Sequence, residues 1–223
     1  MSNSASPYHH GALREALIQA TEALLAERGA DGFSLREVAR RAGVSPAAPS
    51  HHFGDAAGLL TAVATLGFEG LTLALEAGDA RGGADPVAGL REQGLAYVDF
   101  ALRHPGRFRL MFRSGQLHGD PELARHGEAA FEVLARGVRR AFGVADAGHM
   151  SPAHWNAVTA RWSLVHGYSH LAIAGKFDGL AGPEGVQAFV QRSLRPILEA
   201  SLRGLLGPPS ARAAPTRRAG PRR

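Results

Sequence analysis

Apolar residues recur at the spacing of amphipathic α-helices along most of the chain. Between residues 7 and 28, the apolar positions Leu13, Leu17, Ala20 and Leu24 lie on one helical face. Comparable patterns, bounded by Gly, Pro or Asp, predict further helices. These lie at about 34–42, 45–53, 55–77, 86–103, 107–113, 121–142, 152–175 and 183–206. No alternating strand pattern persists and no internal repeat is visible, so the sequence predicts an all-α fold of about nine helices.

Two short helices joined by a tight turn are predicted between residues 34 and 53. Ser34 and Glu37 form the S-x-x-E pattern of a capping box, which marks a helix start. Gly43 follows that helix, where a positive φ is often needed and glycine adopts it without penalty. Ser45 can then cap a second helix. This order is typical of a helix-turn-helix, whose second helix lies in the DNA major groove, although an ordinary αα-hairpin has the same spacing.

This stretch and the residues before it resemble the N-terminal domain of TetR/AcrR-type one-component regulators. A second resemblance lies in Trp162-Ser163-Leu164-Val165-His166-Gly167, which is similar to the Trp-His-Gly signature in one branch of that family's C-terminal domain. The resemblance implies a helix-turn-helix domain, a helical ligand-binding and dimerisation domain, and a homodimeric, ligand-responsive regulator that is by family default a repressor. The N-terminal segments that carry it are 8–14, 20–29, 32–39, 42–45 and 52–53.

Candidate contacts to double-stranded DNA gather at the start of the first short helix and along the second. Ser34 and Arg36 can hold a phosphate at a helix N-terminus. Ser and His can hydrogen-bond phosphates or base edges, and Ala can contact a thymine methyl group. In the family, the positions that match the second helix face DNA; the alternative is that His51 and His52 only end the helix. The predicted DNA-binding residues are Ser34, Arg36, Ser45, Pro46, Ala47, Ala48, Ser50, His51 and His52.

Three residues depart from the family pattern and bear on the strength of DNA binding. Pro49 stands where the family usually has a large apolar residue, and a short, distorted helix is expected if Ser45 is its cap. Ser50 replaces the usual Tyr, and Ala56 replaces a usual Lys. Both changes remove phosphate contacts, so we expect weaker and less salt-dependent binding than is typical.

Aromatic residues in the second half of the chain are candidates for the walls of a ligand cavity, although plain core is the ordinary reading for most of them. Apolar walls with one or two polar groups would suit a small, mostly hydrophobic effector. His166 and His170 have a metal-ligand spacing on a helix, but no third ligand is in sight and no metal is predicted. The predicted ligand-binding residues are Phe100, Phe108, Met111, Phe112, Trp162 and His166.

The last long helix carries an apolar stripe with Pro196 as an expected kink. The resemblance implies that the last two long helices pair across a two-fold axis as a four-helix bundle. The stripe, and with it the predicted dimerisation surface, consists of Val186, Phe189, Val190, Leu194, Ile197 and Leu198.

Composition narrows the class of protein but adds little about DNA. The 223 residues are 45% hydrophobic and contain no Cys, which excludes disulfides and thiolate metal sites. No run of 18 apolar residues and no apolar signal core occurs, so a cytoplasmic location is expected. The net charge is +5, but the segment after Gly207 holds five Arg and no acid. The five arginines of this segment are Arg212, Arg217, Arg218, Arg222 and Arg223. The rest of the chain is nearly neutral, so its net charge is no argument for DNA binding.

The predicted organisation is a disordered start at 1–6, a helix-turn-helix domain at 7–55, a regulatory and dimerisation domain at 56–206, and a disordered Arg-rich tail at 207–223. No P-loop, G-x-S-x-G, GxGxxG after a strand or H-E-x-x-H pattern is present, so neither an enzyme nor a cofactor is predicted. Two alternatives stay open, a His-based hydrolase and a helical protein-interaction module. The sequence does not reveal the effector, the operator or the target genes.

Overall fold

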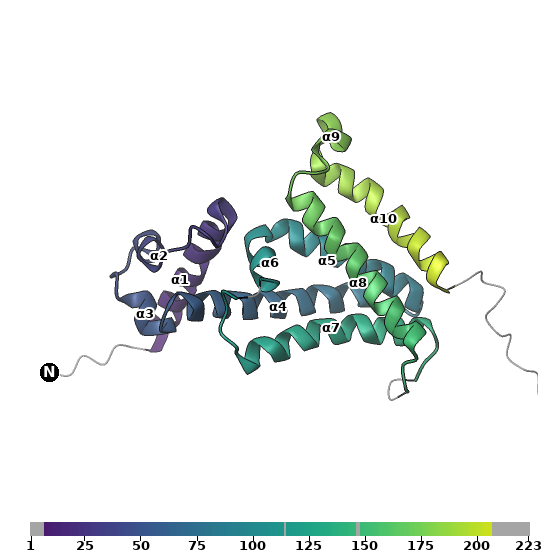
Figure 1. Ribbon diagram of the computed structural model, residues 1–223, viewed down its shortest axis with the longest axis horizontal. Coiled ribbons are helices and arrows are strands. Elements are labelled where there is room, and N and C mark those ends of the chain that lie inside the picture. The colour runs from purple at the N-terminus through teal and green to yellow at the C-terminus, as the bar shows by residue number, and fades with distance from the viewer. Residues whose placement is uncertain (1–6, 114, 146–147, 207–223) are drawn as a thin grey trace, which may run out of the picture.

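The computed structural model describes residues 7–113, 115–145 and 148–206, and in these residues every regular element is a helix (Figure 1). The predicted starts at 7, 86, 121 and 152 coincide with four helix starts, each at a proline. Proline is tolerated at these positions because the first turn needs no N–H donor. The helices are α1 Pro7–Arg28, α2 Leu35–Ala42, α3 Ala48–Phe53, α4 Ala56–Arg81, α5 Pro86–Arg103, α6 Pro105–Met111, α7 Pro121–Ala141, α8 Pro152–Ile173, α9 Asp178–Ala181, the 3-10 turn η1 Gly182–Glu184, and α10 Gly185–Leu206.

Helix α4 is the element that joins the two halves of the molecule. It runs from the small group formed by α1, α2 and α3 along α5 and α7 to the opposite end (Figure 1). Its first turns place Leu59 and Val63 in the core of the small group. Its later turns place Leu71 and Leu75 in the large core shared with α5, α7, α8 and α10. The two hydrophobic cores are therefore connected through one continuous helix.

By length and hydropathy, α4 is also the one helix among the described residues that could cross a membrane. In the most apolar stretch of this helix 44% of the residues are buried inside the protein. Because α4 packs against α5, α6 and α7 along its length, its role as a core helix explains its hydropathy without a membrane.

Two of the predicted caps are wrong in detail. Ser34 precedes α2 in an extended conformation, but its side chain makes no capping hydrogen bond. The carboxylate of Glu37 pairs with Arg40 at 2.7 Å instead of closing a capping box. The side chain of Ser45 caps nothing either, because α3 begins only at Ala48.

The late start of α3 accommodates Pro49. This proline lies in the first turn, where its missing N–H breaks no helical hydrogen bond. Its side chain is buried. The helix is consequently shorter than the predicted 45–53, and the segment 45–47 forms the turn before it.

The second half differs from the prediction in two places. Helix α6 spans Pro105–Met111 and not 107–113, since Pro105 opens its first turn. The short α9 lies between the predicted helices 152–175 and 183–206, and η1 takes the first residues of the latter, so α10 begins at Gly185. The predicted disordered segments 1–6 and 207–223, including the five tail arginines, lie outside the described residues.

Candidate nucleic-acid interface and ligand cavity

A left-handed glycine sets the angle between α2 and α3. Gly43 has φ of 68° and ψ of 31°, and its N–H and that of Val44 bond back to the carbonyls of Arg40 and Ala39 at 3.3 and 3.0 Å. This closure satisfies carbonyls at the end of α2 and requires a residue that adopts positive φ without strain. Val44 then packs against the core of the small group, as its place after the turn predicts.

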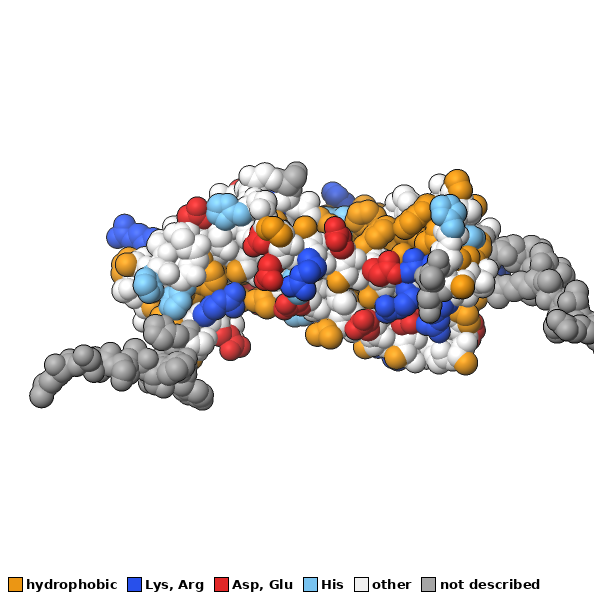
Figure 2. Space-filling view, turned by 90° about the horizontal axis from the view of Figure 1, so that it is seen from below, with side chains coloured by type: hydrophobic (Ala, Val, Ile, Leu, Met, Phe, Trp, Pro, Cys, Tyr) orange, Lys and Arg blue, Asp and Glu red, His pale blue; other side chains and the backbone are white. Residues whose placement is uncertain are grey.

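The residues predicted to contact DNA lie on the outside of this unit, which occupies one end of the molecule (Figure 2). His52 and Ala48 are half-buried, whereas Pro49 turns inward. The guanidinium of Arg14 lies 5.4 Å from the ring centre of Phe53 and covers the end of α3. The exposed members of the predicted set are Ser34, Arg36, Ser45, Pro46, Ala47, Ser50 and His51.

Only one guanidinium of α2 is left without a counter-charge among the described residues. Arg40 is hydrogen-bonded to Glu37 through two nitrogens, at 2.9 and 2.7 Å. Arg41 donates to Glu27 at 2.7 Å and so joins α2 to α1. The hydrogen bond from Arg40 lowers the pKa of Glu37 to about 2, so this carboxylate stays charged and paired. Arg36, exposed in the first turn of α2, forms no ion pair with a described residue and is therefore the cation of α2 that is available to a phosphate.

Helix α6 forms a second connection between the halves. Its Arg107 pairs with Glu22 of α1, and Arg113, just after the helix, pairs with Asp31. Gly106 lets α6 lie directly on α1, because a Cβ there would be 2.7 Å from the backbone carbonyl carbon of Leu25. The small group is therefore held to the rest of the protein through both α4 and α6.

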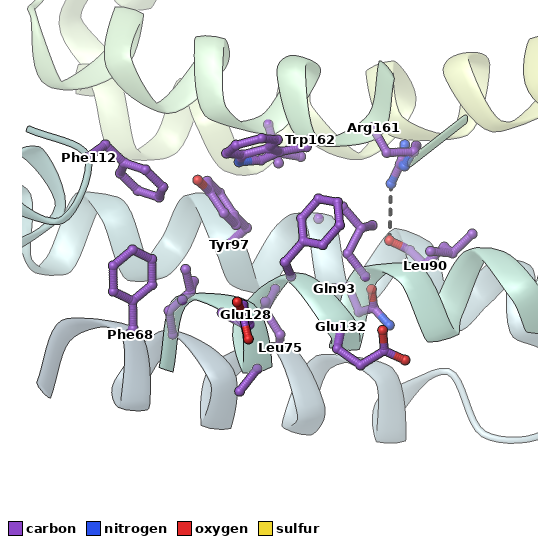
Figure 3. Close-up of a pocket in the computed structure, with 18 of the residues that line it drawn as sticks. Phe68, Leu75, Leu90, Gln93, Tyr97, Phe112, Glu128, Glu132, Arg161 and Trp162 are labelled. Atoms are coloured by element: carbon purple, nitrogen blue, oxygen red, sulfur yellow. Dashed lines mark hydrogen bonds between the residues drawn. The ribbon is translucent and has the colours of Figure 1, made fainter. Parts of the chain in front are cut away.

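A cavity of about 820 Å³ lies in the second half, between α4, α5, α7 and α8 (Figure 3). This volume is within the usual range of about 300–1,000 Å³ for small-molecule sites. Helix α4 contributes Phe68, Leu71 and Leu75 to its walls. The other lining residues are Leu90, Gln93, Gly94, Tyr97, Phe112, Arg125, Gly127, Glu128, Ala129, Ala130, Phe131, Glu132, Leu134, Arg161, Trp162 and Val165.

The predicted ligand-binding set is only partly at this cavity. Phe112 and Trp162 line it, with Trp162 38% exposed. Phe100, Phe108 and Met111 do not line it; they are buried in the part of the large core that lies away from the cavity. The apolar pattern of the sequence does not distinguish a residue packed in the core from one that lines a cavity.

His166 is likewise not part of the lining. Its Nδ1 lies 2.8 Å from the hydroxyl of Tyr97, which does line the cavity. Burial, with a smaller effect of nearby His170, lowers the pKa of His166, which favours the neutral ring in this hydrogen bond. The rings of His166 and His170 lie 4.6 Å apart, and in the part of the chain that the structure describes no group of three His, Asp or Glu is placed to hold a metal ion.

Two buried polar side chains of the cavity are missing from the predicted set. Arg161 of α8 and Gln93 of α5 are each 2% exposed. A helical repeat reveals both, since Gln93 lies between Leu90 and Tyr97 and Arg161 precedes Val165 by one turn. A polar residue on an otherwise apolar helix face is the signal that would have identified them.

The predicted dimerisation stripe of α10 faces mostly inward. Val190, Leu194 and Leu198 are buried in the large core of the same chain. Val186 and Phe189 pack against that core, while Ile197 is 37% exposed. Among the stripe residues, Ile197 alone is thus well exposed to a partner.

Comparisons with known proteins place this architecture in a family. The model for "Bacterial regulatory proteins, tetR family" matches residues 17–63, and the model for "Tetracyclin repressor-like, C-terminal domain" matches residues 90–197. Together they cover both halves of the chain. A search of curated proteins finds no match.

Solved structures agree with the family models. A protein of unknown function from Rhodococcus sp. RHA1 is 34% identical, with 91% of this chain and all of that one covered and a TM-score of 0.73. The TetR family regulator PfmR from Thermus thermophilus is 24% identical over 85% and 94% of the two chains, with a TM-score of 0.61. The TetR-like regulator LfrR from Mycobacterium smegmatis, solved in complex with proflavine, is 20% identical over 88% and 98%, with a TM-score of 0.57.

Membership of the Trp-His-Gly branch stays a prediction, since neither family model tests it. The order of the elements, the helix-turn-helix geometry and the matches to an N-terminal and a C-terminal family model point to one assignment. The chain belongs to the TetR family of transcriptional regulators.

Proposed function

We propose that the protein acts in the cytoplasm as a homodimeric repressor that binds a palindromic operator and is released by a small effector. The observation that carries this proposal is the position of α4. The helix begins three residues after α3 ends, and its later turns form a wall of the cavity. A molecule in the cavity therefore contacts the same rigid element that supports the DNA-facing surface.

The proposed DNA contacts follow from exposure and charge. The exposed Ser50 and His51 of α3, with the half-buried Ala48 beside them, would enter the major groove. Ser34 and Arg36, at the start of α2, would hold a phosphate beside it. A dimer presents two such surfaces, so the operator should contain two half-sites about one helical turn apart, roughly 34–36 Å.

The proposed switch depends on packing along α4. Phe68 faces the cavity from the middle of the helix, while Leu59 and Leu60 anchor the same helix in the core of the small group. An effector that repacks the cavity wall would shift α4 and α6 and so change the spacing of the two recognition helices. It releases DNA only to the extent that it binds the DNA-incompetent state more tightly.

Selection of bound sites from random double-stranded DNA with the full chain tests this function directly. The expected result is an enriched palindrome that binds a dimer. Failure to enrich any sequence at low salt would overturn the proposal. It would favour the alternative of a helical protein-interaction module, which Ser50 and Ala56 keep open because they lack the phosphate contacts of the family pattern.

A further inference from the structure

The cavity contains a buried positive charge without a negative partner. Arg161 is 2% exposed, and its guanidinium donates to the carbonyl of Leu90 at 3.0 Å and to the hydroxyl of Ser201 at 2.7 Å. A longer contact of 3.5 Å reaches the carbonyl of Leu198. All these acceptors are neutral, and no described carboxylate pairs with Arg161. Its Nε has no hydrogen-bond partner among the described residues.

Two carboxylates also line the cavity, but they lie at its exposed side. Glu128 and Glu132 belong to the outer part of α7 and are exposed. Glu132 is already paired with Arg139. Neither is paired with Arg161 in the ion pairs of the described residues, so the charges at the rim do not neutralise the one inside.

The polar and apolar parts of the cavity are separated. Figure 3 shows Arg161, Gln93 and the exposed Glu132 toward one end and Phe68 and Phe112 toward the other, with Tyr97 and Trp162 between them. A molecule that fills this space meets a cation at one end and aromatic rings at the other. It must therefore be amphipathic to satisfy both ends.

Burying a guanidinium costs free energy unless its charge is paired and its N–H groups are hydrogen-bonded. Burial lowers the pKa of Arg161 to about 10, yet the group remains charged at neutral pH. A planar carboxylate matches the donor geometry of a guanidinium better than any neutral acceptor does. Filling the cavity with such a ligand would supply the missing counter-charge.

We propose that the effector is an amphipathic carboxylate, whose head pairs with Arg161 and whose apolar tail extends toward Phe68 and Phe112. This inference rests on the proposed function only in calling the ligand an effector. Binding itself needs neither DNA nor an operator.

A set of three ligands with one tail and different heads tests the head-group requirement on the unaltered full chain. Dodecanoate, dodecanol and dodecylammonium are titrated below their micelle concentrations, and binding is followed by calorimetry and by tryptophan fluorescence. The two tryptophans, Trp155 and Trp162, lie with Phe131 in one aromatic group beside the cavity. Dodecanoate should bind at least about tenfold more tightly than dodecanol, and dodecylammonium should bind least. Equal binding of the acid and the alcohol, or a preference for the ammonium, overturns the proposal.

Variants assign the preference to one residue. Arg161→Gln should weaken dodecanoate binding by about 10- to 100-fold and leave dodecanol nearly unchanged. The matched control is Arg91→Gln, which removes an arginine of α5 that pairs with Glu92 outside the cavity. The hydrogen bonds of Arg161 also join α8 to α5 and α10, so circular dichroism is used to check that the Arg161→Gln variant folds. If this variant does not fold, the comparison of the three ligands on the unaltered chain still tests the proposal. A folded variant that binds dodecanoate like the wild type contradicts the proposal.

The two proposals fail in different ways. If no operator is found but dodecanoate still binds more tightly than dodecanol, the regulatory function fails and the ligand site stands. If an operator is bound but the three head groups bind alike, the regulator stands and the carboxylate assignment fails.

Discussion

The imidazole Nε2 of His118 lies 2.9 Å from Oδ1 of Asp55, so the segment before α7 is hydrogen-bonded to the residue that caps α4. The same carboxylate oxygen accepts the N–H of Gly58 at 2.8 Å, and the backbone N–H of His118 donates to Thr61 at 2.9 Å. The start of α4 is therefore fixed from both sides, by its own cap and by a segment from the second half. This contact joins the end of the DNA-facing unit to the regulatory half.

Loss of this cap should lower stability in a pH-dependent way. The hydrogen bond from Gly58, and next that from His118, lower the pKa of Asp55 below its usual value. The stability that the carboxylate contributes is thus fully present above the pKa of the unfolded chain and is lost as the pH falls through the folded value. Thermal melts should show Asp55→Ala below the wild type at pH 7, with the difference shrinking in acid. Asp55→Ser, which keeps a capping oxygen, is the control, and a difference that does not change with pH would contradict the assignment.

Arg36 should contribute to DNA affinity without reading sequence. It is the α2 guanidinium that forms no ion pair with a described residue, so it can neutralise a phosphate at no cost to an internal contact. Arg36→Ala should weaken binding to all sequences and reduce the salt slope by about 1. Arg103→Ala removes the same charge from an exposed pair with Asp99 in α5 and should leave both quantities unchanged. An unaltered slope for the Arg36 variant would show that α2 does not touch the backbone.

Substitutions of His51 and Ala48 in α3 should lower the affinity for a selected operator. His51→Ala removes a hydrogen-bonding group from the exposed face of α3, and Ala48→Glu adds a charge that phosphates repel. His51→Ala should weaken specific binding more than binding to random DNA, with a cost on the order of 1–3 kcal/mol for a lost base contact. Ala48→Glu should weaken both, because repulsion by phosphates does not depend on sequence. Competition gel shifts measure the ratio. If both variants bind the operator as the wild type does, α3 does not recognise the operator sequence.

Local signals explain why much of the fold is predictable. Asp55 stands directly before the apolar repeat of α4, and Asp120 and Pro121 mark the start of α7, so each start is encoded within a few residues. The start of α3 is encoded by two competing signals. Ser45 favours an early cap, while Pro49 fits only in the first turn, and the later start also buries the proline ring.

The cavity is less predictable because its contacts are distant in sequence. Arg161 reaches the carbonyls of Leu90 and Leu198, which are 71 and 37 residues away. Helical spacing predicts that Arg161 lies on a buried face, but it cannot predict that Arg161 lacks a carboxylate partner there. The same limit explains why Phe108, fully buried, was indistinguishable in the sequence from Phe112 at the cavity wall.

Gly106 should be essential for the contact between α6 and α1. A Cβ at this position would lie 2.7 Å from the backbone N of Ala26, and backbone atoms cannot move aside as the end of a side chain can. Gly106→Ala should therefore push α6 away from α1 and cost about 1–3 kcal/mol of unfolding free energy. Gly119→Ala is the matched control, because its Cβ would meet nothing within 4 Å. Urea denaturation compares the two, and equal midpoints would mean that α6 is not held against α1.

Substitutions in α10 should distinguish the core of the chain from the proposed dimer surface. Leu198 is fully buried within its own chain, so Leu198→Ala should cost about 2–5 kcal/mol of unfolding free energy whether or not a dimer forms. For the same reason, charges at Leu194 and Leu198 would unfold the protein instead of producing folded monomers.

The exposed apolar residues Leu171 of α8 and Ile197 of α10, which are 48% and 37% accessible, are better candidates for a seam between two copies. Leu171→Glu combined with Ile197→Glu should leave the helical content and melting transition of the monomer intact, because neither side chain is buried in the core. Light scattering should then report monomers, and operator affinity should fall because one helix-turn-helix holds only a half-site. A double variant that stays dimeric would place the seam elsewhere, whereas one that unfolds would show that these two residues support the core after all.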